Sequence, residues 1–274
     1  MAMWTDSKII FSLYAQLPTP IIEEDKILIF YSWKKESKSI IGVLYYDLHF
    51  NLIHNDPEVL HPGEKGDFDD SGVMPSCALR IDSDIFIFYT GWHLRESVPY
   101  SQAIGVGKLN KKRKIERLCR GPIFSINQES PILVNSPFVY QEDDCIKMIY
   151  SAGTHWHDNK PCYHLRSAIS YKNFQFLDNS VFFKTDEKNE CISRCCLYEK
   201  EIYFSRKLTD TFYDIYSIEN GNMNIINLKK TKWNSQMCCY PYVFDVNEEK
   251  ILLYNGNDFG KTGIGMIKWK KDIF

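Results

Sequence analysis

The stretch Ile85-Phe86-Ile87-Phe88-Tyr89-Thr90-Gly91-Trp92 decides the fold of this 274-residue chain, because its pattern recurs. It is an apolar run that ends in an aromatic residue followed by a small or polar one. A Pro-containing apolar run, Gly72-Val73-Met74-Pro75-Ser76-Cys77-Ala78-Leu79, precedes it across the polar turn Asp82-Ser83-Asp84. Short apolar runs bounded by turn residues predict the two strands of a hairpin.

The same unit occurs five times along the chain. The aromatic residues in register are Tyr31, Tyr89, Tyr150, Phe204 and Tyr254, at spacings of 58, 61, 54 and 50 residues. The other first runs are 17–22, 135–140, 192–198 and 239–244, and the other second runs are 27–33, 146–153, 202–206 and 251–257. Third runs follow at 40–43, 103–107, 165–170, 213–217 and 263–267. A fourth, outer strand is only weakly marked.

A period of 50–60 residues with about four antiparallel strands per unit is typical of a propeller blade. The sequence therefore predicts an all-β fold, a five-bladed β-propeller, forming a single domain over residues 1–274. The rival, a two-sheet sandwich, would not need five matched repeats. No convincing amphipathic helix is present.

Charge and composition exclude several function classes. With 33 basic and 35 acidic residues the net charge is −2, which carries no electrostatic footprint for nucleic acid. No window approaches the ~18 apolar residues of a membrane span. The segment Met1–Lys8 is not typical of a signal peptide, so we expect a cytoplasmic protein. The nine cysteines include no C-x-x-C pair, which favours reduced thiols and predicts neither a metal nor a cofactor.

Two acidic residues are candidates for catalysis. In a propeller the first strand of each blade lines the channel, so residues at the same level of those strands converge. Asp70, Glu190 and Gln236 each stand five residues before the strand proline or its equivalent. Two carboxylates facing one glycosidic bond are what its cleavage or transfer needs. An ordinary turn at Asp70 and an ordinary loop acid at Glu190 are the alternatives.

Two arginines near Glu190 are candidates for ligand binding. Arg194 lies within a predicted inner strand and Arg206 ends the next one. An Arg there is costly unless it is paired or faces a polar channel. It could bind a carboxylate or phosphate, as in an acidic sugar or a nucleotide-sugar. The alternative to ligand binding, which the sequence supports equally well, is a structural ion pair with Asp70 or Glu190.

Aromatic and histidine side chains follow the blade strands and are expected in loops at the channel mouth, where they suit sugar stacking. A His-x-His pair at 155–157 could suggest a metal, but no third ligand has helpful spacing. The predicted substrate-binding residues are Asp69, Trp92, Tyr100, His155, Trp156, His164, Arg194, Arg206, Asn234, Gln236, Asn255 and Asn257.

Several ordered motifs resemble a bacterial family of glycosidase-like five-bladed propellers. They span about residues 16–269 and include Gly66–Ser76, Tyr89-Thr90-Gly91-Trp92, Cys239-Tyr240-Pro241 and Tyr254-Asn255-Gly256-Asn257. That family resembles the arabinanase, invertase and mannoside-phosphorylase superfamily, in a branch associated with bacterial surface-glycan assembly. The resemblance implies carbohydrate work without fixing the reaction.

Carried over by position, Asp70 and Glu190 match the acidic residues of the branch. The fifth-blade pattern Trp-Asp-Ser-Glu reads Trp233-Asn234-Ser235-Gln236 here, and an amide cannot act as a general acid or base. The Arg-Asp of the first blade is missing after Ser32, and the Arg-Pro of the fourth is Arg194-Cys195. These departures put catalysis in doubt.

Three functions remain open. The first is an enzyme acting at a glycosidic bond, more by transfer than by hydrolysis, in surface polysaccharide or glycan biosynthesis. There Asp70 is base or nucleophile and Glu190 the acid. The second is a catalytically impaired glycan-binding or scaffold propeller, which burial of the acids in a paired network would favour. The third is a protein-interaction propeller, which would need an exposed apolar patch.

Overall fold

A computed structural model describes residues 3–184, 190–209 and 211–270 and shows five fans of antiparallel strands. The first contains β3 (Gln16–Glu23), β4 (Lys26–Lys35), β5 (Lys38–Asp47) and β6 (Leu52–Leu60). The second contains β7 (Gly72–Ile81), β8 (Asp84–Leu94), β9 (Tyr100–Leu109) and β10 (Ile115–Arg117). The third contains β11 (Val134–Glu142), β12 (Cys145–His157), β13 (Lys160–Ser170) and β14 (Leu177–Phe183).

The fourth fan contains β15 (Cys191–Tyr198), β16 (Glu201–Lys207), β17 (Tyr213–Glu219) and β18 (Asn222–Ile225). The fifth contains β19 (Cys239–Val246), β20 (Glu249–Asn255) and β21 (Ile264–Lys270), and its outer strands are β1 (Met3–Trp4) and β2 (Lys8–Phe11). The short α1 (Asn257–Gly260) is a loop turn in which Asp258 and Phe259 have positive φ.

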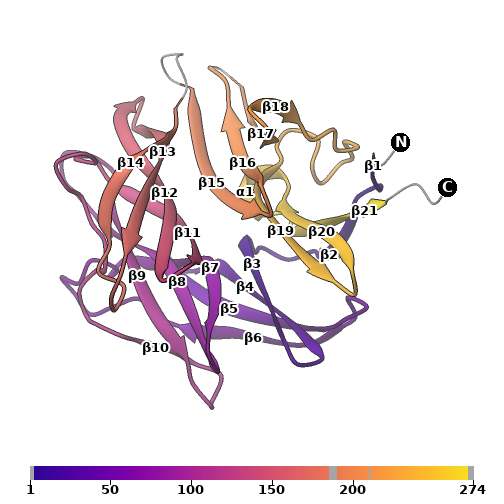
Figure 1. Cartoon of the computed structure of the whole chain (residues 1–274), viewed down its shortest axis with the longest axis horizontal. Coiled ribbons are helices and arrows are strands. Elements are labelled where there is room, and N and C mark those ends of the chain that lie inside the picture. The colour runs from indigo at the N-terminus through magenta and orange to yellow at the C-terminus, as the bar shows by residue number, and fades with distance from the viewer. Residues whose placement is uncertain (1–2, 185–189, 210, 271–274) are drawn as a thin grey trace.

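The fans form a ring. Each of β3, β7, β11, β15 and β19 contacts the next, and β19 returns to β3, so these five strands are the inner strands around a common centre (Figure 1). The first two fans share one parallel bridge, Ser39–Gly72. This arrangement confirms the predicted β-propeller fold and rules out the sandwich. The extent of the domain, residues 1–274, stays a prediction.

Residues near the N-terminus complete the last blade. Both β1 and β2 pair with β21, and the indigo β1 lies beside the yellow β21 in Figure 1. The Lys250 ammonium lies 4.6–5.5 Å from the ring centres of Trp4, Tyr198, Tyr203 and Trp269 and forms an ion pair with Glu201. Cation–π attraction over four rings therefore fastens β1 to the fourth and fifth blades.

Every inner strand has a bulge at the same level. The pairing register shifts within residues 16–19, 75–77, 135–138, 193–195 and 239–242. In four of the five the bulge contains a residue with φ between 42° and 59°: Leu17, Ser136, Arg194 and Tyr240. A bulge leaves one residue out of the ladder, so its N–H needs another acceptor.

The preceding blade supplies that acceptor. The N–H of Ser136, Arg194, Tyr240 and Leu17 donates to Thr90 Oγ1 (2.9 Å), Ser151 Oγ (3.2 Å), Ser205 Oγ (2.8 Å) and Asn255 Oδ1 (2.8 Å), respectively. At the remaining junction Ser32 Oγ donates to the Val73 carbonyl. These buried polar residues are the ones that follow the repeated aromatic, so the sequence repeat is a set of hydrogen bonds between blades.

The repeated aromatic itself faces outward across the blade. Tyr31, Tyr89 and Tyr254 lie opposite Gly42, Gly105 and Gly265 on the third strand. A Cβ on Gly105 would lie 2.3 Å from Tyr89 Cζ, so the ring requires glycine there. The Tyr89 and Tyr150 hydroxyls donate to the carboxylates of Asp69 and Asp178. In the second and third blades the repeated tyrosine thus ties the second strand to an acidic side chain of another segment.

Replacing Ser205 by alanine should destabilise the fold by about 1–3 kcal/mol, because the N–H of Tyr240 would be left without an acceptor. Ser167→Ala is the matched control, since the Ser167 hydroxyl bonds only to Ser180 near the surface. Urea unfolding of the variants measures the difference. Equal stabilities would contradict the role given to these hydrogen bonds.

Candidate functional site

The two predicted catalytic acids stand at the same end of the propeller, just before β7 and β15, in different surroundings. Asp70 is half-buried and accepts from Gly66 N–H and Ser71 Oγ–H, each at 2.9 Å. Glu190 is 4% exposed, and its carboxylate is bonded by Arg206. The Arg206 guanidinium also lies 5.1 Å from the centre of the Tyr216 ring.

Arg206 and Glu190 therefore form the structural ion pair that the sequence left open. The side chain of Glu190 is 2% exposed and that of Arg206 21%, so the pair is largely removed from solvent. A carboxylate held in this way has its charge compensated inside the protein. Glu190 is thus neither free to face a glycosidic oxygen nor available to a ligand's cation.

Asp69 and Asn234, both predicted to bind substrate, lie fully buried behind the repeated tyrosines. Asp69 Oδ2 accepts from Arg117 at 2.8 and 3.0 Å and from the Tyr89 hydroxyl at 3.2 Å. Asn234 Nδ2 donates to the Tyr254 hydroxyl at 3.3 Å. Asp69 therefore joins Tyr89 of β8 to Arg117 of the outer strand β10, whereas Asn234 joins Tyr254 of β20 to the loop that precedes β19.

The two asparagines of the last blade also bond within the protein. Asn255 accepts from Leu17 N–H and donates to the carbonyls of Ala15 and Gly263, so its amide closes the ring. Asn257 accepts from the N–H groups of Gln236 and Met237 and donates to Lys232 and Ser235, which shapes the loop before β19. The Gln236 side chain is exposed.

Arg194 is fully buried in the bulge of β15 and reaches across the ring. Its Nη1 donates to the Pro75 carbonyl and its Nη2 to the Pro18 carbonyl and Thr19 Oγ1, each at 3.0 Å. The Tyr242 ring centre is 5.9 Å away. Burial lowers the pKa of Arg194, but a guanidinium stays charged at neutral pH. No carboxylate among the described residues bonds to it.

An aromatic cluster lies at the end where β9, β13, β17 and β19 begin. Tyr100 meets Trp156 and Trp92 edge-on, with ring centres 5.4 and 6.5 Å away. Tyr163 contacts Tyr100 through its hydroxyl, and Phe259 lies 6.0 Å from both Tyr213 and Tyr240. We call Trp92, Tyr100, Trp156, Tyr163, Tyr213, Tyr240 and Phe259 the mouth cluster.

Four of these residues, Tyr163, Tyr213, Tyr240 and Phe259, are absent from the substrate-binding residues predicted from the sequence. Tyr213 opens the third strand of its blade as Tyr100 does, so alignment of the third runs could have found it. The cluster contains four tyrosines: Tyr100, Tyr163, Tyr213 and Tyr240. Burial raises the pKa of each of these phenols, and for Tyr163 and Tyr240 the neighbouring phenols raise the pKa further. The four hydroxyls therefore stay protonated and can both donate and accept hydrogen bonds.

The two predicted histidines lie beside this cluster on blade 3. His155 Nδ1 is 3.0 Å from Thr154 Oγ1. His164 Nδ1 is buried without a hydrogen-bond partner. Burial, and then the charges of Lys184, His155 and Arg166, lower the pKa of His164, so its ring is neutral at neutral pH.

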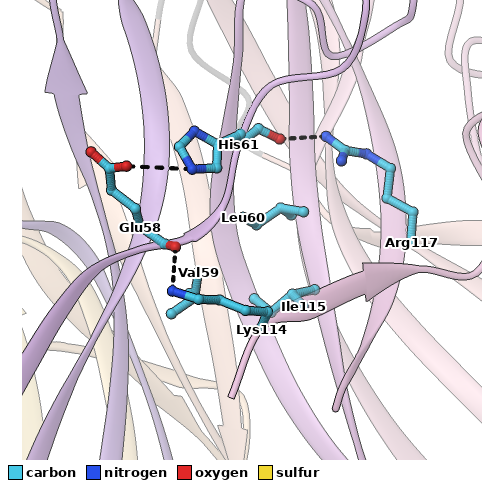
Figure 2. A pocket seen from close by; sticks show the side chains of 7 residues that line it. All are labelled: Glu58, Val59, Leu60, His61, Lys114, Ile115 and Arg117. Carbon is cyan, nitrogen blue, oxygen red and sulfur yellow. Dashed lines mark hydrogen bonds and ion pairs between the residues drawn. The ribbon is translucent and has the colours of Figure 1, made fainter. Parts of the chain in front are cut away.

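A surface cavity lies elsewhere. It has a volume of about 430 Å³ and is lined by Glu58, Val59, Leu60, His61, Lys114, Ile115 and Arg117, between the outer strands β6 and β10. Figure 2 shows that its charged groups already bond one another or nearby carbonyls, as Arg117 does with the His61 carbonyl. We place the candidate site at the mouth cluster, because the predicted aromatic residues meet there and the polar groups of this cavity are satisfied.

Within residues 3–184, 190–209 and 211–270, no group of three or more His, Cys, Asp or Glu side chains could hold a metal ion. In the same ranges no helix has the length and apolarity to cross a membrane. The cysteines described are all free thiols.

Comparison with known proteins places the fold. No protein-family model matches the chain. Two uncharacterized proteins of Mycobacterium tuberculosis are similar: that of strain CDC 1551 / Oshkosh is 27% identical and that of strain ATCC 25618 / H37Rv is 26% identical. Each alignment covers 92% of this chain and 91% of the relative.

Solved structures of carbohydrate enzymes share the architecture. A glycoside hydrolase matches with a TM-score of 0.71 and 13% identity over 96% of this chain and 91% of its own. A GH130 structure matches with a TM-score of 0.67 and 11% identity over 93% of this chain and 84% of its own. It comes from a family of mannoside phosphorylases that contains glycoside hydrolases targeting β-1,2 mannosidic linkages. The Bombyx mori GH32 β-fructofuranosidase matches with a TM-score of 0.63 and 12% identity over 97% of this chain and 61% of its own. The chain has the fold of glycoside hydrolase-like β-propellers.

Arg206→Met should destabilise the protein by about 3–5 kcal/mol, because the buried Glu190 carboxylate would lose its cation. Adding Glu190→Gln should recover part of that loss. Arg120→Met, which removes an exposed partner of Asp67, is the control and should change stability little. Denaturant unfolding of the parent, Arg206→Met, Glu190→Gln and the double variant measures this cycle, and additive effects would argue against the pair.

Proposed function

We propose that this chain is a glycan-binding propeller whose ligand lies against the mouth cluster. The observation that carries the proposal is the convergence of four protonated phenols and two tryptophans from blades 2 to 5 at one end of the ring. Aromatic faces suit the apolar faces of sugar rings, and phenol hydroxyls pair with sugar hydroxyls as donor or acceptor.

The balance of charge at this end supports recognition rather than acid–base chemistry. Of the two predicted acids, Glu190 is neutralised by Arg206, and at the fifth blade the family's acids are amides in this sequence. Burial of an acid in a paired network is the feature expected of a binder. The likeness to glycoside hydrolase structures supports a carbohydrate as the ligand class.

A glycosidic-bond enzyme is the second candidate, and Asp70 favours it. This carboxylate is half-buried, has no cationic partner among the residues that the structure describes, and stands before β7 at the end where the mouth cluster lies. In that function Asp70 is base or nucleophile, and Glu190 would have to exchange its bond to Arg206 for one to the leaving oxygen. Transfer in cytoplasmic glycan assembly fits better than hydrolysis, which would oppose assembly.

Replacing Tyr163 or Tyr240 by phenylalanine should weaken glycan binding about tenfold, the cost of one lost hydrogen bond in a buried site. The probes are mannose and fructose oligosaccharides, glucuronic acid oligosaccharides and UDP-glucose, screened by thermal shift and titrated by calorimetry. Tyr171→Phe is the control, because Tyr171 is exposed at the far end of β13. Binding that both variants leave unchanged would move the site elsewhere, and no binding to any probe would refute it.

Asp70→Asn and Glu190→Gln separate the two candidates. A binder should show no turnover of UDP-glucose or of the oligosaccharides, and both variants should bind as the parent does. An enzyme should lose turnover by at least about a hundredfold in each variant, the usual contribution of a general acid or base. Released sugar or UDP, measured over hours, gives the answer.

A further inference from the structure

The charge of Arg194 is not balanced within the described part of the chain. Its guanidinium donates three hydrogen bonds, to two backbone carbonyls and one hydroxyl, and its buried Nε–H has no acceptor among the described residues. Carbonyl and hydroxyl dipoles solvate a cation but do not neutralise it. Burying an unpaired charge costs several kcal/mol of folding free energy. A buried unpaired charge therefore either contributes to function or is offset by other stabilising interactions.

The unbalanced charge lies next to the mouth cluster. Arg194 occupies the bulge of β15 and Tyr240 the corresponding bulge of β19, and the two side chains influence one another electrostatically. Ser193, directly before Arg194, hydrogen-bonds with Tyr213 of the cluster. The guanidinium therefore lies behind the tyrosines, on the side away from solvent.

Two acids of the fourth blade near this end are compensated by ion pairs. Glu190 pairs with Arg206 and Asp214 pairs with Lys230. Asp70 is half-exposed, so solvent screens its carboxylate more than it screens Arg194. A fully buried cation in a medium of low dielectric acts over a longer range than exposed charges do. The potential at the mouth cluster is thus biased toward positive.

We propose that Arg194 makes the glycan site selective for an anionic sugar, one that bears a carboxylate or a phosphate. The selection works through space, because the guanidinium is committed to Pro18, Thr19 and Pro75 and does not reach the ligand. Arg194 is thus a residue that determines specificity, and it touches no reacting atom. The inference rests on the proposed glycan binding and adds the charge of the ligand to it.

The test compares matched ligands that differ only in charge, by calorimetry at 0.15 M salt. One pair is a glucuronic acid oligosaccharide and its carboxyl-reduced form; the other is glucose 1-phosphate and methyl glucoside. The parent should bind the anionic member at least about tenfold more tightly, as expected for unit charges ~10 Å apart at an effective dielectric of about 20. If the parent prefers the anionic ligand in the glucuronic acid pair only, the recognised group is a carboxylate. If it does so in the glucose 1-phosphate pair only, the recognised group is a phosphate.

Arg194→Met should reduce this ratio to near one, and Arg194→Lys should keep most of it, since the charge remains. Arg80→Met, which removes an exposed cation at the opposite end of β7, is the control for net charge and should leave the ratio unchanged. A merely structural Arg194 would alter both affinities equally and leave the ratio intact.

Two results would overturn the inference. The first is an equal affinity of the parent protein for the anionic and neutral members of each pair, and this result counts even if Arg194→Met fails to fold. Tight binding of the neutral members in that case would still support the proposed glycan binding. The second is a folded Arg194→Met variant that still prefers the anionic ligands as strongly as the parent does. Absence of binding by all four ligands would instead remove both proposals together.

Discussion

The ring depends on one hydrogen bond repeated between blades. At four junctions, a polar side chain after the repeated aromatic of one blade (Thr90, Ser151, Ser205 or Asn255) accepts from a backbone N–H in the next blade's bulge. At the fifth junction Ser32 instead donates to the Val73 carbonyl of the next inner strand. The bulge frees a backbone group, and the neighbour satisfies it. Each blade therefore completes the inner strand of the next, which fixes the distance and rotation between blades.

The bulges also determine what reaches the centre. A residue left out of the ladder is free to turn its side chain along the ring axis, and at β15 and β19 those residues are Arg194 and Tyr240. The feature that joins the blades thus also places a cation and a phenol at one end of the ring. Two residues of the proposed glycan site, Arg194 and Tyr240, thus owe their position to the same irregularity that joins the blades.

Most of the fold could be predicted because the repeat is local: aromatic, polar residue and strand spacing are all read along one chain segment. The site could be predicted only in part. Aligning the inner strands placed Asp70 and Glu190 at the same end of the ring, as the structure has them, but the ion pair of Glu190 with Arg206 on the neighbouring strand could not be read from the spacing. Asn255 looked like a ligand residue because a buried amide and an exposed one have the same sequence signature.

The pairing of β1 and β2 with β21 has a consequence for synthesis. β1 and β2 find their partner only after residues 264–270 have been made, about 250 residues later in the chain. Until then β1, β2 and the whole open ring present unpaired edges, which are templates for wrong pairing. Completion of the last blade is therefore the step at which a chaperone or a low temperature would most improve the yield of this protein.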